Sequence, residues 1–154
     1  MLFGIIGIII LLFCSAMVSA SEVALFSLNQ TDLDELNKTN SSKSSVINQL
    51  LSKPKKLLAT ILVANNFINI GIVILFSFSL NSIFSAIEST VIKFIVEVIL
   101  VTFLILLFGE VLPKVYASRN NVKFACFIAY PISILDKILS PVSIPLRSLT
   151  NFIQ

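Results

Sequence analysis

The chain has 154 residues, of which 56% are hydrophobic and only 12% are charged, and its net charge is +3. Because a soluble domain carries about 25% charged residues, these values exclude a protein that faces water on all sides. The lysines and arginines flank apolar runs instead of forming a basic face, so the sequence predicts no nucleic-acid partner.

The apolar residues form long runs, which predict membrane-spanning α-helices and not the ~10-residue alternating segments of an outer-membrane barrel. The chain has no histidine, so any metal site must use oxygen ligands, which favours Mg²⁺ or Ca²⁺ over zinc or copper. Cys14 and Cys126 lie in apolar surroundings without a CxxC spacing. We interpret them as packed or lipid-facing thiols.

The first predicted span covers residues 2–28. On a helix, Ser15, Ser19 and Glu22 share one face, which predicts a polar stripe directed at protein or at a water-filled cavity. A cleaved signal peptide is the competing interpretation, because residues 18–20 resemble a cleavage site. No positive charge precedes the apolar run, however, and the apolar pattern resumes at Val23.

Residues 29–56 form the longest polar stretch and predict a loop of short amphipathic helices. Thr31 is expected to cap the first helix, with acidic residues following in its first turn. Residues 40–45 are expected to form a loop between two helices, because they are mostly serine, with one asparagine and one lysine.

The second predicted span, residues 57–80, is apolar except for a cluster of asparagines and two serines. Asn65 and Asn69 are four residues apart, so both amides project from one face of a helix. Such amides either hydrogen-bond a neighbouring helix, as is common in membranes, or bind a ligand. The spacing leaves both possibilities open.

The third predicted span, residues 91–116, carries Glu110 after a long apolar run. An ionised carboxylate inside a bilayer is costly, so such a residue usually has a partner and a function. Pro113 is expected to break or kink the helix just after it, which would free backbone carbonyls nearby. Lys114 is one turn from Glu110 and could pair with it, but its position favours the edge of the membrane.

Pro131, Pro141 and Pro145 divide residues 118–154, which predict a juxtamembrane belt of short amphipathic helices, with a fourth span as the alternative. The predicted fold is therefore an all-α membrane protein, with three transmembrane helices and juxtamembrane helices in one domain over residues 1–154. Ten of the eleven basic residues, Arg147 among them, fall on one side of such a membrane domain, and only Lys93 falls on the other. The positive-inside rule places the N-terminus outside and the C-terminus in the cytoplasm.

Each predicted span carries a polar cluster, and a rise of ~1.5 Å per residue places the three clusters at similar depth in the cytoplasmic half of the membrane. Together they could form a cage of hydroxyl, amide and carboxylate oxygens, which suits a hard divalent cation or Na⁺. The residues of these clusters are Ser19, Ser21 and Glu22, then Asn65, Asn66 and Asn69, and finally Glu110.

Three motifs, in this order, resemble the transmembrane (DUF21) domain of the CNNM/CorC family of magnesium transporters. They are Ser-Ala-Ser-Glu-Val-Ala-Leu at residues 19–25, Asn65-Asn66-x-x-Asn69, and Gly109-Glu110-x-x-Pro113-Lys114. The resemblance covers nearly the whole chain. It implies a homodimer in the lipid of the bacterial inner membrane, followed in the full-length protein by cytoplasmic CBS domains that bind ATP. The chain, which ends at Gln154, would correspond to the membrane domain alone.

The resemblance also implies the site residues. Mg²⁺ ligands are expected at Ser19, Asn65, Asn69 and Glu110, with help from backbone oxygen near Ala20. Ser21 and Glu22 are candidates for Na⁺ coupling, and Asn66 is a candidate for Na⁺ or for a supporting contact. The chain departs from the family pattern at Ile61, where a hydroxyl is expected one turn before Asn65.

The leading hypothesis is the membrane domain of a Na⁺-coupled Mg²⁺ exporter that works by alternating access. The alternative is a non-transporting membrane anchor or assembly component, for example a relative associated with gliding motility, in which the polar clusters only hold helices together. We do not expect an enzyme, because without histidine a nucleophilic serine could pair only with a glutamate.

Overall fold

The computed structural model describes the backbone of residues 1–39 and 41–153. Within these ranges it describes all side chains except those at positions 41, 143, 144, 146, 147, 150, 151 and 153, so the expectation that involves Arg147 lies outside the described side chains. Every regular element in the described residues is a helix.

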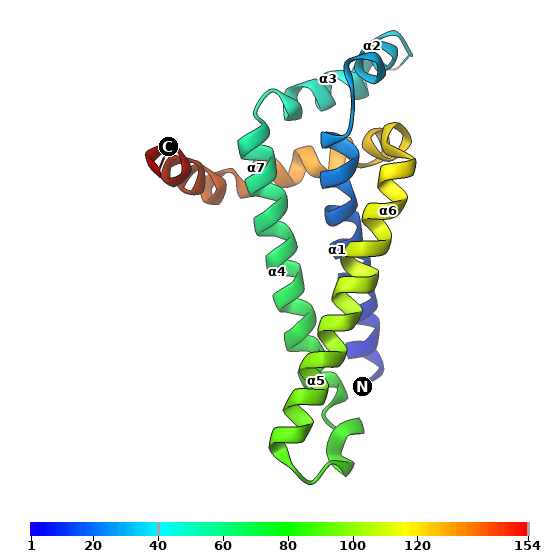
Figure 1. Cartoon of the computed structure of the whole chain (residues 1–154), viewed down its shortest axis with the longest axis vertical. Coiled ribbons are helices and arrows are strands. Elements are labelled where there is room, and N and C mark those ends of the chain that lie inside the picture. Colours follow the sequence, from blue (N-terminus) through cyan, green and yellow to red (C-terminus); the bar gives the residue numbers. More distant parts are fainter. Residues whose placement is uncertain (40, 154) are drawn as a thin grey trace.

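Three long apolar helices run along the molecule (Figure 1). They have 25, 27 and 30 residues, and about 20 apolar residues suffice to cross a bilayer. The chain is therefore a multi-pass membrane protein, and the three predicted spans are confirmed with small changes at their ends. The spans are α1 (Leu2–Phe26), α4 (Pro54–Leu80), and a continuous helix made of α5 (Thr90–Leu104), η2 (Ile105–Val111) and α6 (Leu112–Arg119).

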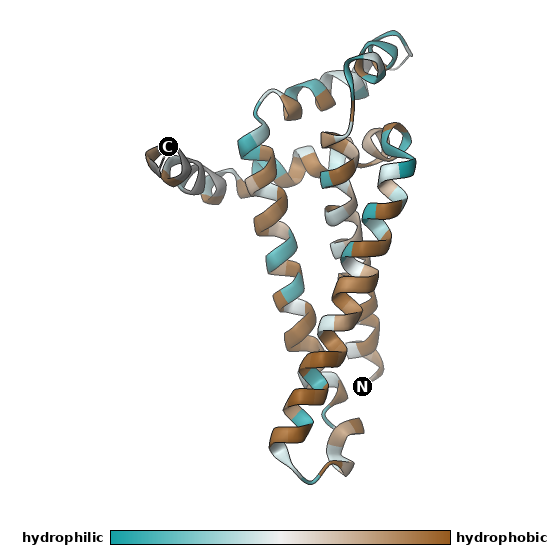
Figure 2. Ribbon diagram, viewed as in Figure 1, coloured by the Kyte–Doolittle hydropathy of each residue, from teal (hydrophilic) through white to brown (hydrophobic). Residues whose placement is uncertain are grey.

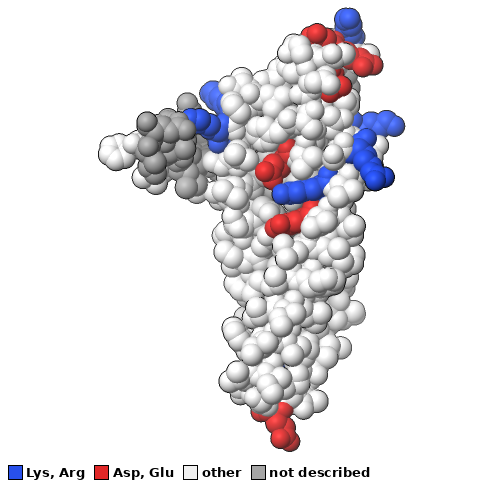
Figure 3. Space-filling view, viewed as in Figure 1, with Lys and Arg blue, Asp and Glu red and all other residues white. Residues whose placement is uncertain are grey.

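The two ends of the bundle differ in structure. We call the end that carries α2 (Gln30–Thr39), α3 (Ser41–Leu51) and α7 (Asn121–Ile153) the wide end. The narrow end holds the N-terminus and the short helix η1 (Ile83–Ala86). Figure 2 shows that hydrophobic residues dominate the long helices, whereas hydrophilic residues gather on α2 and α3. Figure 3 shows Lys and Arg side chains only on the upper part of this face, which is the wide end.

The surface of the long helices is apolar. Phe3, Phe67 and Phe78 are 91%, 79% and 82% exposed. Large exposed apolar areas mark contact with a partner or with lipid. On helices of this length and hydropathy, these side chains fit a surface in contact with hydrocarbon.

The start of α2 differs from the prediction, because Asn29 caps the helix and Thr31 lies inside it. The Asn29 Oδ1 atom accepts a hydrogen bond from the Asp32 backbone N–H at 2.8 Å, and the Asn29 N–H donates to Asp32 Oδ2 at 3.0 Å. This reciprocal pair satisfies two backbone donors at once, so the helix begins at this cap, two residues before Thr31. The expected loop over residues 40–45 is also wrong, because α3 already begins at Ser41. Asn48 Nδ2 donates to Asn37 Oδ1 at 3.2 Å and so ties α3 to α2.

The prolines of the C-terminal region do not divide it into separate helices. Pro131, Pro141 and Pro145 all lie inside α7, a helix of 33 residues. A proline inside a helix costs about 3 kcal/mol, so another interaction must offset it. Along the first half of α7, a buried stripe packs against α1, α3 and α4, and its residues are Ala125, Ile128, Ala129 and Ile132. Figure 1 shows α7 crossing the bundle, and the described residues contain three candidate spans, none of them in α7.

The buried core has two parts. The larger part lies at the wide end and joins α1, α3, α4 and α7 through residues such as Leu25, Ile47, Ile61 and Ala129. The smaller part lies toward the narrow end, where the three long helices meet, and contains Ile8, Ile72, Phe76, Val101 and Ile105.

Alanine at Gly4 is expected to destabilise the bundle, whereas alanine at Gly71 is not. A Cβ atom at Gly4 would lie 1.8 Å from the Oγ and 2.6 Å from the Cβ of Ser79, so rotating the serine side chain cannot relieve the clash. A Cβ atom at Gly71 would meet Leu11 Cδ1 at 3.4 Å, which is an ordinary contact. Overpacking of the first kind costs about 1–3 kcal/mol.

Thermal unfolding in detergent, followed by circular dichroism, compares the two variants. Gly71→Ala is the control, because it makes the same substitution in a spanning helix at a position with room for the methyl group. Equal unfolding midpoints for the two variants would contradict the close packing of α1 on α4 at the narrow end.

Candidate ion site

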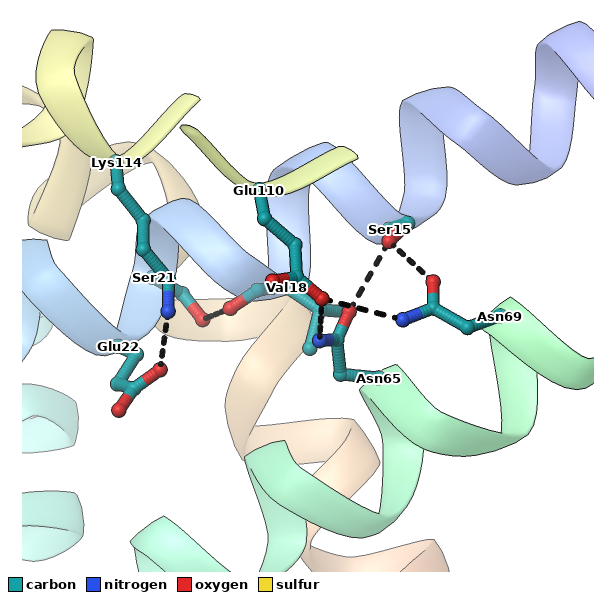
Figure 4. A network of polar contacts seen from close by, with 8 residues as sticks. All are labelled: Ser15, Val18, Ser21, Glu22, Asn65, Asn69, Glu110 and Lys114. Carbon is teal, nitrogen blue, oxygen red and sulfur yellow. Dashed lines mark hydrogen bonds and ion pairs between the residues drawn. The ribbon is translucent and has the colours of Figure 1, made fainter. Parts of the chain in front are cut away.

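Four polar side chains from all three spans meet inside the bundle (Figure 4). The hydroxyl of Ser15 on α1 lies 3.0 Å from Asn65 Oδ1 and 2.8 Å from Asn69 Oδ1, both on α4. The amide nitrogens of these asparagines donate to Oε1 of Glu110 on η2, at 3.4 Å from Asn65 and 3.3 Å from Asn69. The two amides therefore bridge a hydroxyl and a carboxylate.

Local structure explains why these groups meet. Asn65 and Asn69 are one turn apart and so project from the same side of α4. Gly109 lets η2 approach α1 closely, because a Cβ at this position would lie 3.0 Å from the Ser15 Oγ. Any larger residue at 109 would push against the hydroxyl that both amide oxygens approach.

Glu110 belongs to a π-helical segment and not to an ordinary helix. Residues Ile105–Val111 adopt this wider form, and the Leu112 N–H donates to the carbonyl of Leu107, five residues earlier. Pro113 follows at the start of α6. The break or kink expected just after Glu110 is therefore wrong in form: the helix continues, and the irregular backbone precedes the proline. Pro113 cannot donate to the carbonyl four residues earlier, and a wider turn accommodates that loss.

Ser15 takes the contact that the sequence led us to expect of Ser19. Both hydroxyls lie on the same face of α1, one turn apart. The Ser19 Oγ is buried, with the residue 1% exposed, and it has no hydrogen-bond partner among the described residues. A buried hydroxyl without a partner is unusual and needs an explanation, such as an ion or a water.

Ser19 lies between two levels of contact along α1. At the level of Ser15, α1 meets the amides that hold Glu110. At the level of Glu22, it meets Lys114, whose Nζ is 3.3 Å from Glu22 Oε2. Lys114 thus pairs with a carboxylate of α1 and not with Glu110, its neighbour one turn away. Since Ser19 falls between these two levels, its hydroxyl is buried next to the polar cluster.

The other sequence candidates are oriented differently. The Ser21 Oγ donates to the carbonyl of Val18 within its own helix at 2.5 Å. The Asn66 amide likewise donates to the carbonyl of Leu62 at 3.0 Å, and Asn66 is exposed. Glu22 differs from Ser21 and Asn66, because its ion pair with Lys114 joins the first span to the third.

A cavity of about 350 Å³ links the carboxylates of Glu22 and Glu110. Two carboxylates and one ammonium group line it, so its wall carries one net negative charge and attracts cations. Ile61 contributes apolar surface where the resemblance suggested a hydroxyl, and the neighbouring hydroxyl of Thr60 donates to Asp136 of α7 at 2.9 Å. The lining residues are Glu22, Leu58, Ile61, Leu62, Asn65, Asn66, Glu110 and Lys114.

The donor set suits a hard cation. Among the described residues, no group of three or more His, Cys, Asp and Glu side chains could hold a metal. The available ligands are the carboxylate of Glu110, two amide oxygens and the hydroxyls of Ser15 and Ser19, to which water can be added. Mg²⁺ accepts such sets, because it typically keeps several waters and one or two carboxylates.

Comparison with known proteins supports the assignment from sequence. Residues 6–154 match the family model described as the Cyclin M transmembrane N-terminal domain (CNNM). The chain is 32% identical over 139 residues to the UPF0053 inner membrane protein YfjD of Escherichia coli, which covers 90% of the chain and 30% of that protein. It is 32% identical over 137 residues to a UPF0053 protein of Haemophilus influenzae, covering 87% of the chain and 31% of that protein.

A further relative is the UPF0053 protein sll1254 of Synechocystis sp., which is 28% identical over 149 residues, or 94% of the chain and 40% of that protein. The chain thus spans 30% to 40% of the length of these three relatives. The family match covers nearly all of the chain, and it agrees with the three long apolar helices and the motifs that they carry. The chain belongs to the CNNM (Cyclin M) transmembrane-domain family.

Proposed function

We propose that this domain exports Mg²⁺ in exchange for Na⁺, and that Ser19, Asn65, Asn69 and Glu110 bind the Mg²⁺ ion. One observation carries the proposal: the amides of Asn65 and Asn69 both lie between the Ser15 hydroxyl and the Glu110 carboxylate, so hydroxyl, amide and carboxylate groups meet in one place. All three spans contribute to this arrangement, so a relative movement of the spans changes the site. Alternating access requires such a link between site and helix movement.

The two amides supply a simple response to a cation. In the structure, their NH₂ groups donate to Glu110 and their oxygens face Ser15. The terminal torsion of asparagine is broad and roughly two-fold, so a half-turn exchanges oxygen and nitrogen at modest cost. Both amide oxygens would then lie beside the Glu110 carboxylate, where a cation replaces the two donated hydrogen bonds. The Ser19 hydroxyl, which has no hydrogen-bond partner among the described residues, adds a further oxygen at the neighbouring level of α1.

The cavity between Glu22 and Glu110 is the route that we propose to the site. Its volume of about 350 Å³ leaves room for Mg²⁺ with part of its water shell, which the ion sheds reluctantly. Of the basic residues with described side chains, only Lys93 lies on the spans toward the narrow end. The positive-inside rule therefore favours a cytoplasmic wide end, with the N-terminus outside.

We propose that Na⁺ competes with Lys114 for Glu22. The two side chains are 38% and 37% exposed, so their ion pair is accessible from the cavity. A sodium ion at Glu22 would release Lys114 and change the charge next to the Mg²⁺ site. Binding of one ion would then alter the affinity for the other, which is the requirement for coupled transport. In this proposal Ser21 and Asn66 support the site and do not bind Mg²⁺.

The printed name of the Escherichia coli relative, an inner membrane protein, supports a bacterial inner membrane for this chain as well. We further propose that the domain works as a homodimer in lipid, and that ATP-binding CBS domains belong to the full-length protein. The matched region covers less than half of the length of each of these relatives, so the remaining length of the relatives is sufficient for such domains.

A non-transporting membrane anchor is the second candidate. Hydrogen bonds between helices are the common role of asparagine in membranes, and the contacts of Asn65 and Asn69 have this form. The apolar Ile61 in the cavity wall also favours it. This candidate predicts that the polar residues matter for stability and not for ion binding.

Glu110→Gln is expected to abolish most Mg²⁺ binding while leaving the fold intact. The variant keeps a hydrogen-bond acceptor of the same size but removes the charge that the ion requires. Changes in groups that only support a metal ligand already cost 10–100-fold in affinity, so loss of the charged ligand should cost at least about 100-fold. Isothermal titration of the purified protein in detergent with MgCl₂ measures the effect.

The matched control is Glu97→Gln, the same change on α5 outside the site. It should leave the Mg²⁺ affinity unchanged. Wild-type affinity in Glu110→Gln, combined with a lower unfolding midpoint in Asn69→Ala, would reject the metal site and favour the anchor.

Glu22→Gln is expected to uncouple Mg²⁺ movement from Na⁺. A coupling of 5–150-fold is typical of linked sites, so Na⁺-driven Mg²⁺ efflux from proteoliposomes should fall by about tenfold or more. Mg²⁺ binding in sodium-free buffer should persist, because Glu22 does not contact the amides, but added Na⁺ should no longer alter the Mg²⁺ affinity. Lys114→Gln should act in the opposite direction and raise the apparent affinity for Na⁺. Efflux that keeps its full Na⁺ dependence in Glu22→Gln would remove Glu22 from the coupling mechanism.

A further inference from the structure

A second polar cavity lies at the wide end, away from the ion site. It has a volume of about 120 Å³, several times the space that one water molecule requires. It lies where the end of α3, the start of α4 and the middle of α7 come together. Its lining residues are Gln49, Leu50, Lys53, Lys56, Leu57, Ser133, Asp136 and Lys137.

The charges in this cavity do not balance. Three lysines and one aspartate line it, which leaves two positive charges. Asp136 is fully engaged: its Oδ2 lies 3.1 Å from Lys56 Nζ, and its Oδ1 accepts a hydrogen bond from Thr60 at 2.9 Å. Among the described residues, Lys53 and Lys137 have no carboxylate within 4.0 Å. Two ammonium groups and the polar side chains of Gln49 and Ser133 are therefore available to an anion.

The position of the cavity indicates the source of that anion. The apolar part of α4 begins at Leu57, in the wall of the cavity, so the lysines lie at the level where a membrane span ends. Farther along α4, between α4 and α7, lies an apolar cavity of about 360 Å³. It is lined by Val63, Ala64, Phe67, Ile68, Leu135, Leu139 and Val142. A lysine-rich cavity at the membrane surface and an apolar cavity lined by deeper residues of α4 and by α7 match the two parts of a phospholipid.

We propose that the cavity lined by Lys53, Lys56 and Lys137 binds the phosphate of an anionic phospholipid headgroup. The acyl chains of this lipid extend along the apolar cavity between α4 and α7. Lys53 and Lys137 bind the phosphate directly, whereas Lys56 is held by Asp136. Such a lipid would connect α7 to the start of α4, and this role is independent of ion transport.

Native mass spectrometry of the full chain in detergent tests the proposal, with phosphatidylglycerol and phosphatidylcholine as probes. Wild type should retain phosphatidylglycerol in preference to phosphatidylcholine. The variant K53Q/K137Q should lose roughly 30-fold in affinity for phosphatidylglycerol, which corresponds to about 1 kcal/mol for each lysine near an anionic surface. K53R/K137R keeps both charges and should retain binding, and an unfolding midpoint of K53Q/K137Q equal to that of wild type excludes misfolding as the cause of its loss.

The matched control is K38Q/K123Q, which removes two exposed lysines of the wide end outside the cavity. It should retain wild-type affinity. An equal loss in this control, or equal retention of both lipids by wild type, would overturn the proposal.

A titration with inorganic phosphate distinguishes a lipid phosphate from a soluble phosphate as the bound anion. Phosphate binding that depends on Lys53 and Lys137, without retained phosphatidylglycerol, would assign the cavity to a soluble phosphate and reject the lipid.

Discussion

The carboxylate of Glu110 lies among apolar helices, and the rest of the bundle has to satisfy it. Placing an ion in a protein interior costs several kcal/mol even after relaxation, so its oxygens need strong partners. Two amide groups on consecutive turns of α4 donate to it, and the Ser15 hydroxyl of α1 meets the other ends of those amides. The third span is thus joined to the first two through polar atoms at one depth.

This constraint accounts for several local features that otherwise look unrelated. Gly109 removes the side chain that would hold η2 away from Ser15. The π-helical turn of η2 precedes Pro113 and keeps a continuous helix through a residue that cannot donate a hydrogen bond. At the narrow end, Gly4 lets α1 and α4 touch. Toward the wide end, the polar cavity that is lined by Glu110 and Glu22 adjoins the cluster of Ser15, Asn65, Asn69 and Glu110.

The same features decide what a cation would find. A carboxylate, two amides and a buried hydroxyl that has no hydrogen-bond partner in the described part of the chain lie close to one another. In the proposed transport cycle, both amides turn, and coordination bonds to the ion replace the hydrogen bonds that the amides donate to Glu110. Because the ligands sit on three separate helices, occupancy and helix arrangement depend on each other.

The sequence predicted the three spans because their apolar runs are long and uninterrupted, and it placed a polar cluster on each of them. It also predicted that Asn65, Asn69 and Glu110 would lie close together. It did not predict that Ser15 would contact the amides. Helical periodicity shows on which face of its helix a residue lies, but not which residue of a neighbouring helix lies opposite it. The Glu22–Lys114 pair was missed for the same reason, since it joins two different spans.

Other errors came from tertiary packing and from cap chemistry. Three prolines suggested short helices, yet α7 is one helix over residues 121–153, and its first half packs on α1, α3 and α4. Thr31 had the right residue type for a cap, but Asn29 forms a reciprocal pair with Asp32 and starts the helix two residues earlier. The proline and cap preferences of single residues are read from the sequence alone. The contacts that overrode them depend on where a second residue lies in the folded chain.

An experimental structure determined with Mg²⁺ tests the central claim most directly. The account predicts density for one ion beside Glu110, with ligand oxygens at about 2.0–2.1 Å and both amides of Asn65 and Asn69 turned so that their oxygens face it. The Ser19 hydroxyl should lie in the coordination sphere or contact a water of the ion. An empty site at millimolar Mg²⁺, with both amide nitrogens still donating to Glu110, would contradict the account.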